Sequence, residues 1–120
     1  MKLARLALPA LLLVALAGCA GYPPVQIPSG VHSQAADQVR EGIIELQNSE
    51  HVAAGDRFET AIILDPKLAE AHYNLAIVLD KQGKHAEAEQ HLKEAAALAP
   101  NNPAIVGSEF YLKHVKGGMR

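Results

Sequence analysis

A pattern of small and bulky residues occurs twice in this chain at an offset of 34 residues. The first copy contains Ala54, Phe58, Ala61 and Pro66, and the second contains Ala88, Leu92, Ala95 and Pro100. Small residues at matched positions let paired helices approach closely, and a proline ends the helix that precedes it. Alanine is abundant and runs of β-branched residues are scarce, and this composition favours helix. The sequence therefore predicts an all-α fold of repeated helix pairs.

The clearer copy is residues 69–102, AEAHYNLAIVLDKQGKHAEAEQHLKEAAALAPNN. It resembles the tetratricopeptide repeat, a 34-residue helix–turn–helix unit. The residues that carry this resemblance are His72, Leu75, Ala76, Leu79, Gly83, Ala88, Leu92, Ala95 and Pro100. His72 departs from the family, which usually has Trp or Leu there, and Leu92 replaces an aromatic residue. Gly83 follows the first helix and suits the left-handed conformation that ends it.

The flanking segments suggest a short array of such units. Residues 35–68 form a degenerate repeat, with helices expected at Val31–Gln47 and Glu50–Leu64 and a turn between them. Residues 103–117 supply only the first helix of a third unit, which predicts one C-terminal capping helix. The expected domain, residues 31–120, is therefore a tetratricopeptide-repeat array of two helix pairs plus a cap. Three repeats are usually needed to bury a continuous core, so a homodimer or docking on a larger assembly is expected.

The N-terminus has the pattern of a bacterial lipoprotein signal peptide over residues 1–18. Lys2 and Arg5 precede a 12-residue apolar stretch, which is shorter than the roughly 20 residues needed to span a bilayer. The following Leu-Ala-Gly-Cys resembles a lipobox, which implies lipidation of Cys19. The alternative is an ordinary secretory signal with an incidental cysteine. Ala20, rather than Asp, follows Cys19, and by the same resemblance this favours the outer membrane, facing the periplasm.

Residues 19–30 combine the lipidated cysteine with a segment of three prolines and two glycines. Proline fixes φ and removes a hydrogen-bond donor, so this segment is not expected to form a helix. The sequence predicts an extended tether that lifts the domain off the membrane.

By the resemblance, the first helix of each unit lines a concave groove. Carrying those positions over gives the expected groove residues Val39, Arg40, Ile43, Tyr73, Asn74, Ile77, Lys81 and Tyr111. Asn74 matches an asparagine that bonds to the ligand backbone in peptide-binding relatives. The groove is expected to hold a protein or peptide partner through apolar anchors. The alternative is that these side chains pack against a neighbouring element, such as the tether or a second subunit.

Composition argues against several other classes of function. The net charge of −2 gives no electrostatic footprint for nucleic acid, and the single cysteine allows no internal disulfide. The six histidines show no metal-ligand spacing, and no nucleophile or phosphate-binding motif is present, so neither an enzyme nor a cofactor is expected. The expected function is a lipid-anchored periplasmic adaptor in the assembly of an envelope complex, such as a secretin, pilus or outer-membrane machine. The alternatives are a self-associating structural lipoprotein and an accessory subunit of a secreted enzyme or transporter.

Overall fold

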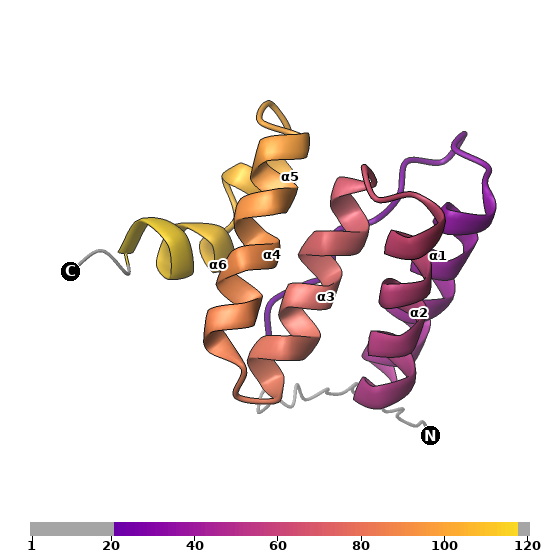
Figure 1. Ribbon diagram of the computed structural model, residues 1–120, viewed down its shortest axis with the longest axis horizontal. Coiled ribbons are helices and arrows are strands. Elements are labelled where there is room, and N and C mark those ends of the chain that lie inside the picture. The colour runs from indigo at the N-terminus through magenta and orange to yellow at the C-terminus, as the bar shows by residue number, and fades with distance from the viewer. Residues whose placement is uncertain (1–20, 118–120) are drawn as a thin grey trace, which may run out of the picture.

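The computed structural model describes residues 21–117, and every regular element within this range is helical (Figure 1). Helix α1 (Gln34–Gln47) pairs with α2 (His51–Leu64), and α3 (Ala69–Lys81) pairs with α4 (His85–Leu98). The two hairpins meet where α2 packs against α3. This arrangement confirms the predicted all-α short array of helix pairs. The expected signal peptide and Cys19 lie outside the described residues, within which no helix has the length and apolarity to cross a membrane.

The turns inside the two hairpins share one backbone feature, a residue with positive φ. Ser49 has φ 66° and Gly83 has φ 81°, so each hairpin turns through one residue in the left-handed region. Glycine adopts this conformation without steric cost, whereas Ser49 carries a Cβ and is strained there. At the start of α1, the Ser33 hydroxyl accepts a hydrogen bond from the Ala36 N–H at 3.1 Å. This cap begins the helix at Gln34, so the expected start at Val31 is wrong.

Small side chains allow the helices of each hairpin to lie close together. Ala54 and Phe58 in α2 and their counterparts Ala88 and Leu92 in α4 are fully buried. Helix α1 is continuous through Gly42, where an added Cβ would lie 2.6 Å from Cε1 of Phe58. Glycine is therefore required at this crossing by the aromatic ring that faces it. The other residues of the repeat pattern are placed as follows: Ala61, Leu75, Ala76, Leu79 and Ala95 are buried, and Pro66 and Pro100 are exposed just after α2 and α4.

The C-terminal cap differs from the single helix expected over residues 103–117. It consists of α5 (Pro103–Val106), α6 (Glu109–Tyr111) and the π-helical turn η2 (Leu112–Lys116). The break has a local cause, because the Ser108 hydroxyl donates to the Ile105 carbonyl at 2.7 Å and accepts from the Tyr111 N–H at 3.1 Å. Ser108 thus ends one helix and caps the next. Ile105 and Phe110 remain fully buried, so the broken cap still covers the array.

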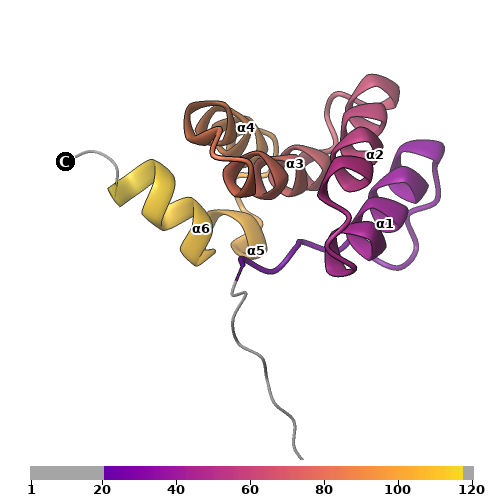
Figure 2. The same cartoon turned by 90° about the horizontal axis from the view of Figure 1, so that it is seen from below.

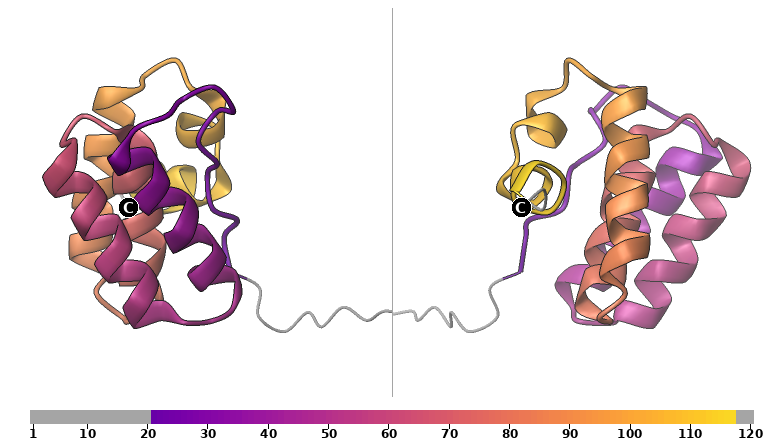
Figure 3. Two further views of the ribbon diagram at one scale, coloured as in Figure 1. Left: turned by 90° about the vertical axis from the view of Figure 1, so that its right-hand side faces the viewer. Right: turned by 60° about the vertical axis from the view of Figure 1, so that its left-hand side comes forward.

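The largest difference from expectation concerns residues 21–30, here called the N-terminal segment. This segment is extended, as its prolines require, but it is not a free spacer. It runs across α1 and α3, on the side away from α2 and α4, and reaches α5 and α6 (Figure 2). Figure 3 shows the same course from two further directions. Val25 and Ile27 are 8% and 7% exposed and belong to the hydrophobic core.

Candidate functional site: the groove of α1 and α3

The expected groove residues of the two long helices share one face of the array. Val39 and Ile43 come from α1, and Tyr73, Asn74 and Ile77 come from α3. All five are buried, with exposures of 3% or less. A groove open to solvent would leave such side chains partly exposed. Their burial, together with the course of the N-terminal segment over α1 and α3 (Figure 2), shows that the chain fills its own groove.

Asn74 holds the N-terminal segment through its main chain. The Asn74 Oδ1 accepts from the Val25 N–H at 2.8 Å, and the Asn74 Nδ2 donates to the Val25 carbonyl at 2.9 Å. Asn74 is fully buried, so these two bonds satisfy an amide that would otherwise be costly to desolvate. Both bonds are to main-chain atoms. Through these two bonds the groove recognises the extended backbone of the segment, while the Val25 side chain is buried in the core.

The side chains of the segment alternate in the way expected of an extended chain. Val25 and Ile27 are buried, whereas Gln26 between them is exposed. Successive side chains of an extended chain point to opposite faces, so residues two apart reach the same surface. The groove thus accepts two apolar side chains separated by one residue that faces solvent.

Aromatic rings close one end of the groove. The ring of Tyr22 stacks on Phe110 with centroids 4.4 Å apart, and Phe110 meets Tyr73 edge to face at 5.7 Å. Burial raises the pKa of the Tyr73 phenol, although a hydrogen bond with Ser108 acts in the opposite direction. Tyr73 therefore stays neutral at ordinary pH and serves as packing.

Two basic residues lie at the rim. Arg40 pairs with Asp37 at 3.0 Å and donates to the main-chain carbonyls of Pro28 and Val31, so it fastens the end of the N-terminal segment to α1. Lys81 is exposed and lines a hollow beside Tyr22. Arg40 therefore holds the occupant in place, while Lys81 stays available to solvent.

Tyr111 is not brought into the groove. It lies partly buried in a separate hollow that Lys93 and Val115 also line, and the neighbouring Phe110 takes the groove position. The family positions were carried over on one continuous helix, and the break at Ser108 changes which residue faces inward. Sequence reasoning missed Phe110 for this reason. Two signals could have identified it: the bulk of its side chain, and the preceding Gly-Ser pair, which indicates a new helix start.

A cavity of about 900 Å³ remains beside the segment. The N-terminal segment forms one wall with Tyr22 and Pro24, and Tyr73 and Phe110 contribute aromatic surface to the lining. Glu70 and Glu109 are its two carboxylates. The site therefore keeps open space at its aromatic end even with the segment in place.

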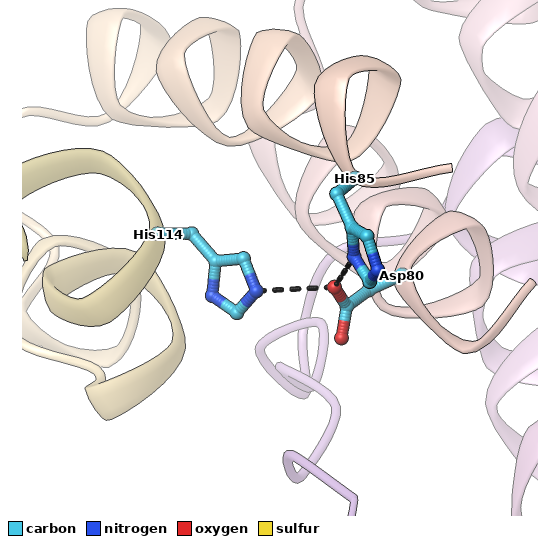
Figure 4. Close-up of side chains that lie close together, drawn as sticks. All are labelled: Asp80, His85 and His114. Carbon is cyan, nitrogen blue, oxygen red and sulfur yellow. Dashed lines mark hydrogen bonds and ion pairs between the residues drawn. The ribbon is translucent and has the colours of Figure 1, made fainter. Parts of the chain in front are cut away.

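A second group of polar side chains lies near the groove, between α3, α4 and the C-terminal turn. Asp80 Oδ1 is 2.7 Å from His85 Nδ1 and 3.0 Å from His114 Nε2 (Figure 4). These residues come from three elements, so their separations along the chain show no ligand motif. They are the group of described residues whose ligand atoms could surround a metal ion.

Comparison with known proteins agrees with the repeat. Residues 69–102 match the tetratricopeptide repeat model. Over 59 residues, the chain is 37% identical to protein bimA of Emericella nidulans. The match covers 49% of this chain and 7% of that protein. The chain therefore spans a small fraction of this relative, and the similarity supports the repeat alone. Residues 69–102 are a tetratricopeptide repeat, a unit typical of non-enzymatic scaffolds that bind other proteins.

Proposed function

We propose that this chain is a lipid-anchored adaptor of the bacterial cell envelope, periplasmic and held in the outer membrane, whose groove on α1 and α3 binds an extended segment of a protein partner. The observation that carries the groove is the pair of hydrogen bonds between Asn74 and the Val25 main chain. Since these bonds are to main-chain atoms, a second extended chain can make them in place of residues 21–30.

The chemistry of the occupant defines the class of partner segment. Val25 and Ile27 fill the groove at alternate positions, and Tyr22 stacks on Phe110 three residues earlier. The expected partner segment is extended and apolar at two positions two residues apart, with an aromatic residue upstream. The chain's own segment competes with it, so partner binding requires the segment to leave. Such an adaptor suits the assembly of an envelope complex such as a secretin, pilus or outer-membrane machine.

The proposed anchor would hold the array close to the membrane. Cys19 precedes Tyr22 by three residues, so even a fully extended chain spans at most about 10 Å between them. Because Tyr22 is packed on Phe110, the domain lies near the lipid surface for as long as the segment stays in the groove. Release of the N-terminal segment would therefore have two effects at once: it lengthens the tether and it opens the groove.

A peptide added in trans tests the groove. The labelled peptide GYPPVQIPSG, the sequence of residues 21–30, is titrated into the wild type and into the variant Val25→Asp with Ile27→Asp. The variant's own segment is expelled, so the variant is expected to bind the peptide at least tenfold more tightly than the wild type. Adding Asn74→Ala to this variant removes both main-chain bonds and is expected to weaken binding again. Circular dichroism confirms that helicity is retained, and equal, weak binding by all three proteins would contradict the groove proposal.

The partner is then captured in the native membrane. A photo-crosslinking residue replaces Lys81, which is exposed beside Tyr22. Mass spectrometry is expected to identify one envelope protein whose yield rises when Val25→Asp and Ile27→Asp are added and falls with Asn74→Ala. If none of the three substitutions changed the crosslinking yield, the partner would bind another surface of the protein.

The anchor is tested separately. Cys19→Ser is expected to remove the protein from the outer-membrane fraction, and intact-mass analysis of the wild type is expected to show an acylated N-terminus at Cys19. If the Cys19→Ser variant stayed in the outer-membrane fraction and the wild type carried no acyl group, the lipid anchor would be removed from the proposal. The groove proposal would be unaffected.

One observation favours self-association as a second candidate function. The first hairpin exposes Ile44 at 58%, Val52 at 72% and Ile63 at 80%, which are large apolar side chains in contact with solvent. Val52 and Ile63 are about three helical turns apart and so lie on the same side of α2. Sedimentation velocity separates the two candidates, since self-association is lost in Val52→Asp with Ile63→Asp whereas peptide binding is not.

A further inference from the structure

We propose that Asp80, His85 and His114 form a binding site for a divalent transition-metal ion of the zinc type. Asp80 lies in the last turn of α3, His85 is the first residue of α4, and His114 belongs to η2. Figure 4 shows the two imidazole rings approaching the same carboxylate from different elements. The two hydrogen bonds within the site, Asp80–His85 and Asp80–His114, involve no atom of residues 21–30, although Tyr22 of that segment packs against the His114 ring.

The spacing of the three ligand atoms suits one ion. Asp80 Oδ1 is 2.7 Å from His85 Nδ1 and 3.0 Å from His114 Nε2, and all three atoms lie within 4.8 Å of one another. A tetrahedral zinc ion with ligands at 2.0–2.1 Å separates its ligand atoms by about 3.3 Å. To reach this separation, the nitrogens of His85 and His114 would move about 0.6 and 0.3 Å away from Asp80 Oδ1.

The orientation of His114 is the stronger argument. Its Nδ1 lies 3.1 Å from the Phe110 carbonyl oxygen, which can only accept, so Nδ1 carries the hydrogen. The other ring nitrogen, Nε2, therefore faces Asp80 Oδ1, at 3.0 Å. A metal ion held by Nε2 and the Asp80 carboxylate would replace this direct contact. Metal-binding histidines show this same arrangement, with one ring nitrogen bonded to a backbone carbonyl and the other facing the ion.

The surroundings hold two of the ligands and leave the third accessible. The His114 ring packs edge-on against Phe110 at 4.7 Å and against Tyr22 at 5.8 Å, which fixes its orientation. The side chains of His114 and Asp80 are 18% and 19% exposed, whereas that of His85 is 68% exposed. An ion therefore enters from the His85 side, and water completes its fourth position.

The donor set selects the class of metal. Two imidazole nitrogens and one carboxylate oxygen suit zinc and neighbouring first-row ions, whereas calcium and magnesium prefer oxygen ligands alone. A bound ion would tie η2 to the α3–α4 hairpin and so secure the C-terminal cap, which otherwise rests on the contacts of Ile105 and Phe110. Metal binding is expected to stabilise the fold, because the unfolded chain does not hold the three ligands together.

Calorimetric titration of the full chain with ZnCl2 tests the site. The protein is purified in detergent, stripped with a chelator and titrated at pH 7.5. One ion per chain is expected, and His85→Ala and His114→Ala are each expected to raise the dissociation constant at least tenfold. Asp80→Asn, which keeps the shape of the side chain but not its charge, is expected to do the same. His32→Ala is the matched control, since His32 is exposed outside the helices and should leave binding unchanged.

Two further measurements make the result decisive. His85 is exposed, so His85→Ala is expected to keep the wild-type helicity, and its loss of binding then reflects the lost ligand. The visible spectrum of the Co²⁺-loaded protein should show tetrahedral coordination in the wild type and lose it in His85→Ala. The absence of saturable Zn²⁺ binding would overturn the proposal. Wild-type affinity in both His85→Ala and His114→Ala, with loss in His91→Gln, would also overturn it by moving the ion to the His72–His91 pair.

Discussion

His72 and His91 face each other across the second hairpin, with their Nδ1 atoms 3.1 Å apart. His72 Nε2 is 2.9 Å from the Pro66 carbonyl oxygen and donates to it. Its Nδ1 shares a hydrogen bond with His91 Nδ1. This explains how a histidine occupies a position where relatives of the repeat carry Trp or Leu. The ring is 7% exposed and satisfied at both nitrogens.

The pair predicts that the fold loses stability on acidification. Burial lowers the pKa of His91, the neighbouring His72 lowers it further, and Glu87 and Glu94 oppose the shift. An unfolded histidine titrates near pH 6.5, so between that pH and the folded pKa the unfolded chain binds more protons. The contribution of His91 is therefore fully present above about pH 6.5 and falls as the pH drops below it. Urea unfolding at pH 7.5 and pH 5.0 measures the change.

His91→Gln is the matched comparison for this prediction. Glutamine keeps a polar side chain at the site but has no titratable group. The free energy of unfolding of the variant should fall less between pH 7.5 and pH 5.0 than that of the wild type. An equal fall in both proteins would assign the acid sensitivity to other groups.

Gly42→Ala tests the close crossing of α1 and α2. The new Cβ would lie 2.6 Å from Phe58 Cε1 and 3.0 Å from Arg57 Cβ, so the helices must separate or the ring must move. We expect a loss of about 1–3 kcal/mol in the free energy of unfolding, despite alanine's better helix propensity. Gly30→Ala is the control, since nothing lies within 4 Å of its added Cβ. Chemical unfolding compares the two, and equal stabilities would contradict the crowding argument.

Ala88→Leu tests the same packing rule in the second hairpin. Ala88 is fully buried, whereas Ala86 on the same helix is exposed to solvent. Overpacking at Ala88 is expected to cost about 1–3 kcal/mol. Ala86→Leu should change stability by less than about 0.5 kcal/mol. Thermal unfolding of both variants measures the difference, and a neutral Ala88→Leu would show that the hairpin tolerates a wider helix separation.

The repeated hairpins were predictable because their signal is local and occurs twice. Ala54 and Phe58 stand 34 residues before Ala88 and Leu92, and all four are buried at equivalent places. The break in the cap is also local, but its signal is weaker. In the Gly-Ser pair before Glu109, the glycine suits the end of one helix and the serine suits the N-cap of the next. The expectation of a single helix did not take this pair into account.

The occupant of the groove was harder to predict, because prolines indicate extended backbone without saying what the backbone touches. Val25 and Ile27 flank the polar Gln26, an alternation typical of a half-buried extended chain, and this was the available signal. The Asp80, His85 and His114 cluster had no comparable signal. Its members come from three helical elements, and only the tertiary packing of η2 against α4 brings them together.

Asn74→Ala should release the N-terminal segment while the hairpins stay folded. Its amide makes both of its hydrogen bonds to Val25, so its loss removes the side-chain acceptor of the Val25 N–H and the side-chain donor to the Val25 carbonyl. Alanine is small and favours helix, so α3 is expected to persist. The Val25 N–H, which donates to Asn74 in a buried contact, is expected to be protected from hydrogen exchange in the wild type. It should exchange at least tenfold faster in the variant, while amides in the middle of α3 keep their protection. Asn102→Ala is the control, because the Asn102 side chain caps α5 at Ala104 and does not touch the segment's main chain. If the Val25 amide stayed protected in Asn74→Ala, the apolar contacts of Val25 and Ile27 alone would hold the segment, and a partner would have to displace those contacts rather than the amide pair.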